Sequence, residues 1–127
     1  MFVILIKYRL KYNKLMKHKA VAIIPARGGS KRIPRKNIIK LGDMPLIAHS
    51  IKTALESKYL NGLVYVSTED KNIASISQKY GAKIIQRPID LAGDNSTTLS
   101  VLQHAVKTLE DDGLDFDTVV LLQATCP

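Results

Sequence analysis

Cysteine is nearly absent from this chain of 127 residues, which contains only Cys126. A single cysteine cannot form an internal disulfide, so a disulfide-stabilised scaffold is excluded and a reducing, cytoplasmic location is favoured. Long apolar runs are missing as well, and none approaches the ~20 residues that a membrane-spanning helix requires. The sequence has no internal repeat and no low-complexity segment. Since 46% of the residues are hydrophobic, length and composition predict one folded domain with its own core.

Several common functional motifs are also missing. The phosphate-binding pattern GxxxxGK[ST] and the dinucleotide pattern GxGxxG do not occur. No two histidine or cysteine residues stand at a metal-ligand spacing, which argues against a zinc site. His49 and His104 fall in predicted helices, where we expect structural or solvated side chains, and no base is identifiable for Cys126. The acidic residues between positions 110 and 117 are expected to form a solvated turn rather than a metal site.

Acidic side chains are missing from the first 40 residues, and this absence explains the net charge of +8. Residues 1–19 carry a charge of +6 and residues 27–40 carry another +6, whereas residues 41–127 carry −4. The positive charge is therefore confined to a tail and one loop. This distribution argues against a large polyanion such as nucleic acid as the partner, and no membrane partner is expected either.

Residues 1–19 form a basic extension whose apolar stretch precedes its charges. A secretory signal has the opposite order and a small-residue cleavage site, so we do not expect one here. We expect an unstructured extension, and a natural start at Met16 would explain it. An arm that contacts a membrane surface or nucleic acid is the alternative.

The chain from residue 20 onward alternates short apolar runs with amphipathic segments. Four of the runs are typical of buried strands, and they lie at 20–25, 63–66, 83–86 and 118–122. Helical periodicity follows Pro45, Thr68 and residues 95–98. Thr68 is the expected cap of the second helix, with Glu69 and Asp70 in its first turn.

This alternation predicts an α/β fold with a parallel, doubly wound sheet, right-handed crossovers and helices on both faces, spanning residues 20–127. In such a sheet, ligands bind beyond the carboxyl ends of the strands. We therefore expect the functional residues in the loops at that edge, which are 27–44, 67–70, 87–98 and 123–127.

The basic loop, residues 26–37 (ARGGSKRIPRKN), has the composition of an anion-binding site. Gly28 and Gly29 leave backbone N–H groups free to approach a ligand, and Ser30 adds a hydroxyl donor. Asn37 can contact a sugar or the edge of a base. Three basic side chains can surround a polyphosphate, and they belong to Arg27, Lys31 and Lys36. The alternative is a basic loop that only faces solvent.

The basic loop resembles the nucleotide-binding signature of the cytidylyltransferases that activate nine-carbon acidic sugars, the acylneuraminate cytidylyltransferase family. Three further stretches are similar to that family in order and spacing: VSTED at 66–70, RPIDLAGDNSTT at 87–98 and LLQATCP at 121–127. The resemblance covers residues 19–127. It implies a Rossmann-like fold of the nucleotide-diphospho-sugar transferase type.

The resemblance also implies a chemistry. A cytidylyltransferase of this family transfers CMP from CTP to the anomeric hydroxyl of N-acylneuraminate (sialic acid) or a related nonulosonic acid and releases pyrophosphate, with Mg²⁺ or Mn²⁺ as the cofactor. Lys36 and Arg27 would be catalytic, because they would stabilise charge on the phosphoryl oxygens. The residues implied in CTP binding are Arg27, Gly28, Gly29, Ser30, Lys31, Lys36, Asn37, Arg87, Thr97, Thr98 and Gln123.

The sequence departs from the family at Glu69, where aspartate is usual, and at Ala124 and Cys126, where proline and serine are usual. Family members are longer, which implies that this chain is an amino-terminal part without the metal ligands, much of the sugar site or the dimerisation arm. A homodimer is implied for the full-length protein. Pseudaminate, legionaminate and 3-deoxy-manno-octulosonate stay open as alternative acceptors. A truncated chain that binds CTP without turnover is a further alternative.

Overall fold

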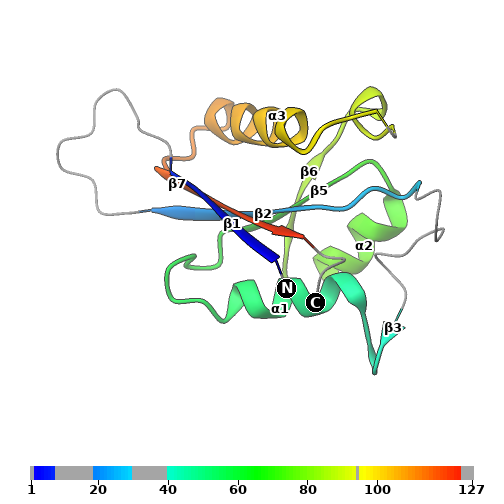
Figure 1. Ribbon diagram of the computed structural model, residues 1–127. Helices are drawn as coiled ribbons and strands as arrows, with labels where there is room; N and C mark the ends of the chain where they lie inside the picture. The colour runs from blue at the N-terminus through cyan, green and yellow to red at the C-terminus, as the bar shows by residue number, and fades with distance from the viewer. Residues whose placement is uncertain (1, 8–18, 30–39, 94, 124–127) are drawn as a thin grey trace.

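The computed structural model of the protein describes residues 2–7, 19–29, 40–93 and 95–123 (Figure 1). In chain order the elements are β1 (Phe2–Lys7), β2 (Ala20–Pro25), β3 (Lys40–Leu41), β4 (Met44–Pro45), α1 (Leu46–Leu55), β5 (Val64–Thr68), α2 (Lys71–Lys79), β6 (Lys83–Gln86), the 3₁₀ helix η2 (Ile89–Leu91), α3 (Thr98–Asp111) and β7 (Thr118–Gln123).

In the part of the chain that the structure describes, five strands form the main sheet, in the order β1-β7-β2-β5-β6. Strands β7, β2, β5 and β6 are parallel, and Ala22 in the middle of β2 pairs with Val120 on one side and Val64 on the other. The predicted parallel sheet is therefore confirmed. The strands predicted at 20–25 and 83–86 have those bounds, whereas the strand predicted at 63–66 lies one to two residues later.

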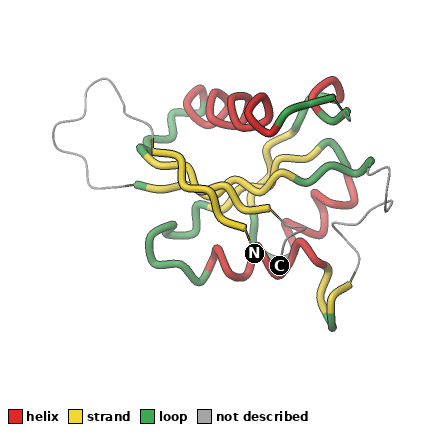
Figure 2. Tube along the Cα trace, viewed as in Figure 1, coloured by secondary structure: helices red, strands yellow, loops and turns green. Residues whose placement is uncertain are grey.

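The helices cover both faces of the sheet, with α3 on one side and α1 and α2 on the other (Figure 2). Val21 and Ile23 of β2 belong to the core layer that contains the inner face of α3. Ala22 and Ile24 belong to the layer formed with α1 and α2. Because side chains alternate between the two faces and both faces are covered, this strand is apolar at every position rather than at every second one.

The start of α2 differs from the prediction. Asp70, not Thr68, caps the helix, and its Oδ1 accepts hydrogen bonds from the N–H groups of Asn72 and Ile73 at 2.8 and 3.0 Å. Thr68 is the last residue of β5. Glu69 therefore lies in the connection between strand and helix rather than in the first helical turn, and its carboxylate makes a different contact, described below.

The amino-terminal extension also differs from the prediction. Residues 2–7 form β1, which pairs antiparallel with β7 from Phe2 opposite Gln123 to Lys7 opposite Thr118. The expectation of an unstructured extension is wrong for these six residues, and residues 8–18 lie outside the described residues. Without β1, β7 would be an edge strand with unpaired N–H and C=O groups, and pairing with β1 satisfies them.

Candidate active site

The carboxyl ends of β2, β5 and β6 lie next to one another at one edge of the sheet. Pro25 is opposite Ser67 in the β2–β5 pair, and Thr68 is opposite Gln86 in the β5–β6 pair. The loops that follow these strands therefore start side by side, as the parallel topology predicted. The last residue of β7, the half-buried Gln123, lies at the same edge, because β7 runs parallel to β2.

Arg87, the first residue after β6, is held against β5. Its side chain is 4% exposed, and it donates from Nε to Ser67 Oγ at 3.2 Å and from Nη2 to Ser67 O at 2.9 Å. Burial lowers the pKa of the Arg87 guanidinium, Glu69 opposes this shift and Arg27 adds to it. That Arg87 contacts the nucleotide stays a prediction, and the structure shows that its side chain also binds Ser67, which the sequence did not indicate.

The carbonyl of Ser67 binds residues that directly follow two other strands, β2 and β6. It accepts a hydrogen bond from the N–H of Ala26 at 2.9 Å in addition to the bond from Arg87. The N–H of Arg87 also donates to the carbonyl of Thr68 at 3.0 Å. The starts of the basic loop and of the loop after β6 are thus both fixed to the end of β5.

Gly28 is anchored by Glu69. The Gly28 N–H donates to Glu69 Oε1 at 2.6 Å, a short bond of the charge-assisted kind. The glycine composition of the loop predicts an N–H that is free for a ligand, but in the structure a side chain from the β5–α2 connection engages it. This role of Glu69 has no signal in the local sequence, because Glu69 and Gly28 are 41 positions apart.

The two glycines of the basic loop have different surroundings. A Cβ atom on Gly28 would lie 2.8 Å from Asp70 Cβ and 2.9 Å from Asp70 Cγ, which is closer than real Cβ contacts allow. Among the described residues, a Cβ atom on Gly29 would meet nothing within 4 Å, and Gly29 is exposed. Gly28 is therefore required by close packing, whereas no described atom hinders the approach of a ligand to Gly29.

Four predicted CTP-binding residues, Ser30, Lys31, Lys36 and Asn37, lie outside the described residues. Their roles stay predictions. The described start of the basic loop nevertheless ends with the exposed Gly29, directly before them.

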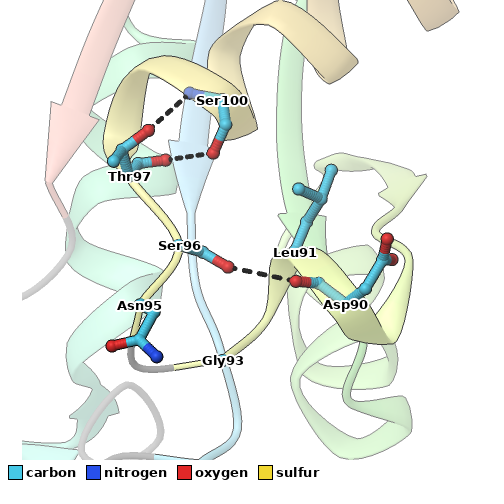
Figure 3. A pocket seen from close by; sticks show the side chains of 7 residues that line it. All are labelled: Asp90, Leu91, Gly93, Asn95, Ser96, Thr97 and Ser100. Atoms are coloured by element: carbon cyan, nitrogen blue, oxygen red, sulfur yellow. Dashed lines mark hydrogen bonds between the residues drawn. The ribbon is translucent and has the colours of Figure 1, made fainter.

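A cavity of about 500 Å³ lies in the connection between β6 and α3 (Figure 3). The residues around it are mostly small and polar, and they are Asp90, Leu91, Gly93, Asn95, Ser96, Thr97 and Ser100. Ser96 Oγ donates to the carbonyl of Asp90 at 3.3 Å, so one hydrogen bond ties its two sides together (Figure 3). The volume is within the range of small-molecule sites.

Thr97 and Thr98, predicted as CTP-binding residues, begin α3. Thr97 is the N-cap, and its Oγ1 accepts a hydrogen bond from the Ser100 N–H at 3.0 Å while its carbonyl accepts one from Ser100 Oγ at 2.8 Å. Thr98 is the first helical residue and is exposed. The Thr97 hydroxyl oxygen thus has a helix-capping partner, and any ligand contact is a further role.

The carboxylates at this edge do not form a metal site by themselves. Glu69 Oε1 is engaged by Gly28, and Asp70 Oδ1 caps α2. Across the described ranges, no three His, Cys, Asp or Glu side chains stand close enough together to hold a metal ion. The described residues by themselves thus offer no preassembled cluster of metal ligands. Within the same ranges, no helix is both long and apolar enough to cross a membrane.

The fold is that of an α/β protein in which four strands are parallel. Its candidate site lies at the edge formed by the carboxyl ends of β2, β5 and β6. The family model described as Cytidylyltransferase matches residues 21–127. The chain belongs to this family, and the resemblance inferred from its motifs is confirmed.

Individual relatives match most of this chain. It is 44% identical over 110 residues to the pseudaminic acid cytidylyltransferase of Campylobacter jejuni, covering 86% of this chain and 47% of that protein. It is 37% identical over 112 residues to the N-acylneuraminate cytidylyltransferase of Escherichia coli, covering 88% and 26%. A solved structure of CMP:2-keto-3-deoxy-manno-octonic acid synthetase complexed with CTP is similar, with a TM-score of 0.66, 30% identity and coverage of 84% and 40%. The chain thus spans less than half the length of these proteins.

Proposed function

We propose that this chain carries the CTP-binding part of a cytidylyltransferase, which transfers CMP from CTP to the anomeric hydroxyl of a nonulosonic acid and releases pyrophosphate. The observation that carries the proposal is that the carbonyl of Ser67 accepts hydrogen bonds both from Ala26, directly before Arg27, and from the buried Arg87, at the carboxyl ends of the parallel strands. Guanidinium groups are well suited to phosphate oxygens, and this edge is where parallel α/β sheets bind ligands. Membership of the cytidylyltransferase family supports CTP as the nucleotide.

In the proposed reaction, the sugar hydroxyl attacks the α-phosphorus of CTP, and the bond from that phosphorus to pyrophosphate breaks. The protein forms no covalent bond, so it contributes by aligning the reactants and stabilising charge. Arg27 holds the triphosphate, and Lys36 stabilises the developing charge. Ser30, Lys31 and Asn37 complete the nucleotide contacts of the basic loop. The cavity beside Asp90 and Ser96 has room for part of the substrate.

A divalent cation, Mg²⁺ or Mn²⁺, belongs to the proposal because the family implies one. When bound, such an ion neutralises charge on the phosphates. We assign it no ligand among the described residues.

The acceptor that we propose is N-acylneuraminate or another nonulosonic acid. The similarity to relatives named for pseudaminic acid and for N-acylneuraminate supports this class of sugar. Because the identity to the first is higher, pseudaminate belongs in the test beside N-acetylneuraminate. A chain that binds CTP without turnover is the second candidate. The test below includes it because this chain covers less than half of either relative.

Pyrophosphate release tests the proposal. The chain is incubated with Mg²⁺, CTP and, in turn, N-acetylneuraminic, pseudaminic, legionaminic or 3-deoxy-manno-octulosonic acid, with ATP as the control nucleotide. Release that requires both CTP and one acceptor supports the transferase. CTP binding by calorimetry without release selects the second candidate. A chain that does not bind CTP, or that binds ATP equally well, contradicts both.

A further inference from the structure

Glu69 occupies a position that the proposed reaction does not explain. It follows the last residue of β5, and its side chain reaches the basic loop, where Oε1 accepts the hydrogen bond from Gly28. Its other oxygen, Oε2, is buried and has no hydrogen-bond partner among the described residues. Burying a carboxylate oxygen without a partner is unfavourable, so the contact with Gly28 and the nearby charges must compensate for it.

Those nearby charges are two guanidinium groups. Arg27 lies close enough to the buried Arg87 to disfavour the charged form of the Arg87 guanidinium. Glu69 acts in the opposite direction, because its negative charge favours the charged form of Arg87. Within the described part of this edge, Glu69 is thus a negative charge that opposes the effects of burial and of Arg27 on the Arg87 guanidinium.

The backbone of Arg27 is held on both sides. Ala26, the residue before it, donates its N–H to the carbonyl of Ser67 at 2.9 Å. Gly28, the residue after it, donates its N–H to Glu69 at 2.6 Å. The first anchor is a continuation of strand pairing, whereas the second depends on a single side chain. Loss of the Glu69 carboxylate therefore removes the anchor of the Gly28 peptide, directly after Arg27.

We propose that Glu69 is a positioning residue, whose carboxylate fixes the Gly28 peptide and so presents Arg27, beside Arg87, to the triphosphate of the nucleotide. This inference rests on the proposed function, since it names what holds the CTP-binding loop in place. It makes Gly28 an anchor rather than a phosphate ligand. Phosphate contacts from the backbone then begin at the exposed Gly29.

Three variants separate the loss of the Gly28–Glu69 hydrogen bond from the general effect of removing a negative charge. Glu69→Ala removes the acceptor oxygen and the charge, and Glu69→Gln keeps an acceptor oxygen of the same reach but removes the charge. Glu110→Gln is the matched control, because it removes the same charge from an exposed position on α3. Glu69→Met, which fills similar space without an acceptor oxygen, replaces the alanine variant if that chain does not fold.

Two measurements are made on each 127-residue variant. Amide hydrogen exchange of Gly28, followed by NMR without ligand, reports the hydrogen bond itself. Calorimetric titration with CTP, and separately with inorganic tripolyphosphate, measures the affinity for the phosphates. We expect Glu69→Ala to lose protection of the Gly28 amide and to bind both ligands about tenfold more weakly, as for one lost charge-assisted hydrogen bond. Glu69→Gln should restore protection and return affinity to within about threefold of the parent chain, since the peptide anchor is kept.

The possible failures are distinguishable. If the parent chain does not bind CTP, the proposed function is wrong and the inference falls with it. If the parent chain binds CTP but Glu69→Ala binds it within twofold, the inference alone is wrong. It is also wrong if Glu69→Gln binds as weakly as Glu69→Ala, or if the control Glu110→Gln shows the same loss.

Discussion

The guanidinium of Arg87 donates two hydrogen bonds to a single residue, Ser67, one to its hydroxyl at 3.2 Å and one to its carbonyl at 2.9 Å. The same carbonyl accepts the N–H of Ala26. One peptide group in β5 therefore joins the exits of β2 and β6. Arg87 and Ser67 are 4% and 0% exposed, so water does not compete for these bonds. This junction gives the loops of the candidate site a common, rigid start.

Replacement of Arg87 tests the importance of this junction. Arg87→Lys should lower the free energy of unfolding by about 1.5–3 kcal/mol, because an ammonium group cannot reproduce a planar two-point contact in a buried site. Urea denaturation monitored by circular dichroism measures the change. Ser67→Ala removes the hydroxyl bond and leaves the carbonyl bond, so its loss should be only about 0.5–1.5 kcal/mol. An Arg87→Lys chain as stable as the parent would show that the junction contributes little.

The two glycines of the basic loop make a matched pair for a second prediction. Gly28→Ala should cost about 1–3 kcal/mol of stability, because the new methyl group would overlap Asp70 and force the loop and the α2 cap apart. Gly29→Ala should change stability by no more than about 0.5 kcal/mol, since no atom of the described residues lies within 4 Å of the new methyl group. Thermal unfolding of both variants gives the comparison. Equal losses at the two positions would contradict the close approach of Gly28 to Asp70.

Much of this fold could be predicted because its strands are buried on both faces. Ala20–Pro25 is apolar at every position since one set of side chains contacts α3 and the other contacts α1 and α2. The start of α2 could not be predicted as well. Thr68, Glu69 and Asp70 all suit a helix start. In the structure Asp70 is the cap, whereas Glu69 accepts a hydrogen bond from Gly28. That contact is long-range, so the local sequence does not encode it.

The meeting of the loops at the carboxyl ends of the strands was predictable, but the contacts between them were not. Parallel topology brings the three loops to one edge, so Arg87 and the basic loop were expected near each other. That Arg87 is fixed by Ser67, twenty positions earlier, depends on burial and strand register, which residue types alone do not specify. The strand β1 could not be predicted either, because it pairs with β7, which lies at the far end of the sequence.

Thr97 was predicted to bind CTP and is observed to cap α3, and a third prediction separates these roles. Thr97→Ala should lower the free energy of unfolding by about 0.5–2 kcal/mol, because the Ser100 N–H loses its acceptor. Thr97→Ser keeps the hydroxyl oxygen and should restore stability. Thermal unfolding measures the cap, and calorimetry with CTP measures the ligand role. A Thr97→Ala chain with unchanged stability and weakened CTP affinity would identify Thr97 as a ligand contact instead.

Pairing of β1 with β7 gives the last prediction, which concerns the edge of the sheet. Ile4 lies opposite Leu121, and Leu5 lies opposite Val120, in an antiparallel pair. In such a pair only every second residue of an edge strand directs its N–H toward its partner. Of the two variants Ile4→Pro and Leu5→Pro, one therefore removes a bond of the ladder, and the other removes an N–H that faces away from β7.

The variant that removes the ladder bond should be less stable by about 1–3 kcal/mol and should self-associate more, because part of the β7 edge is released. Urea denaturation and size-exclusion chromatography measure the two effects. Deletion of residues 1–7 should exceed the effect of either proline, since it exposes the whole edge. If the two proline variants and the deletion all match the parent chain, β1 does not protect β7.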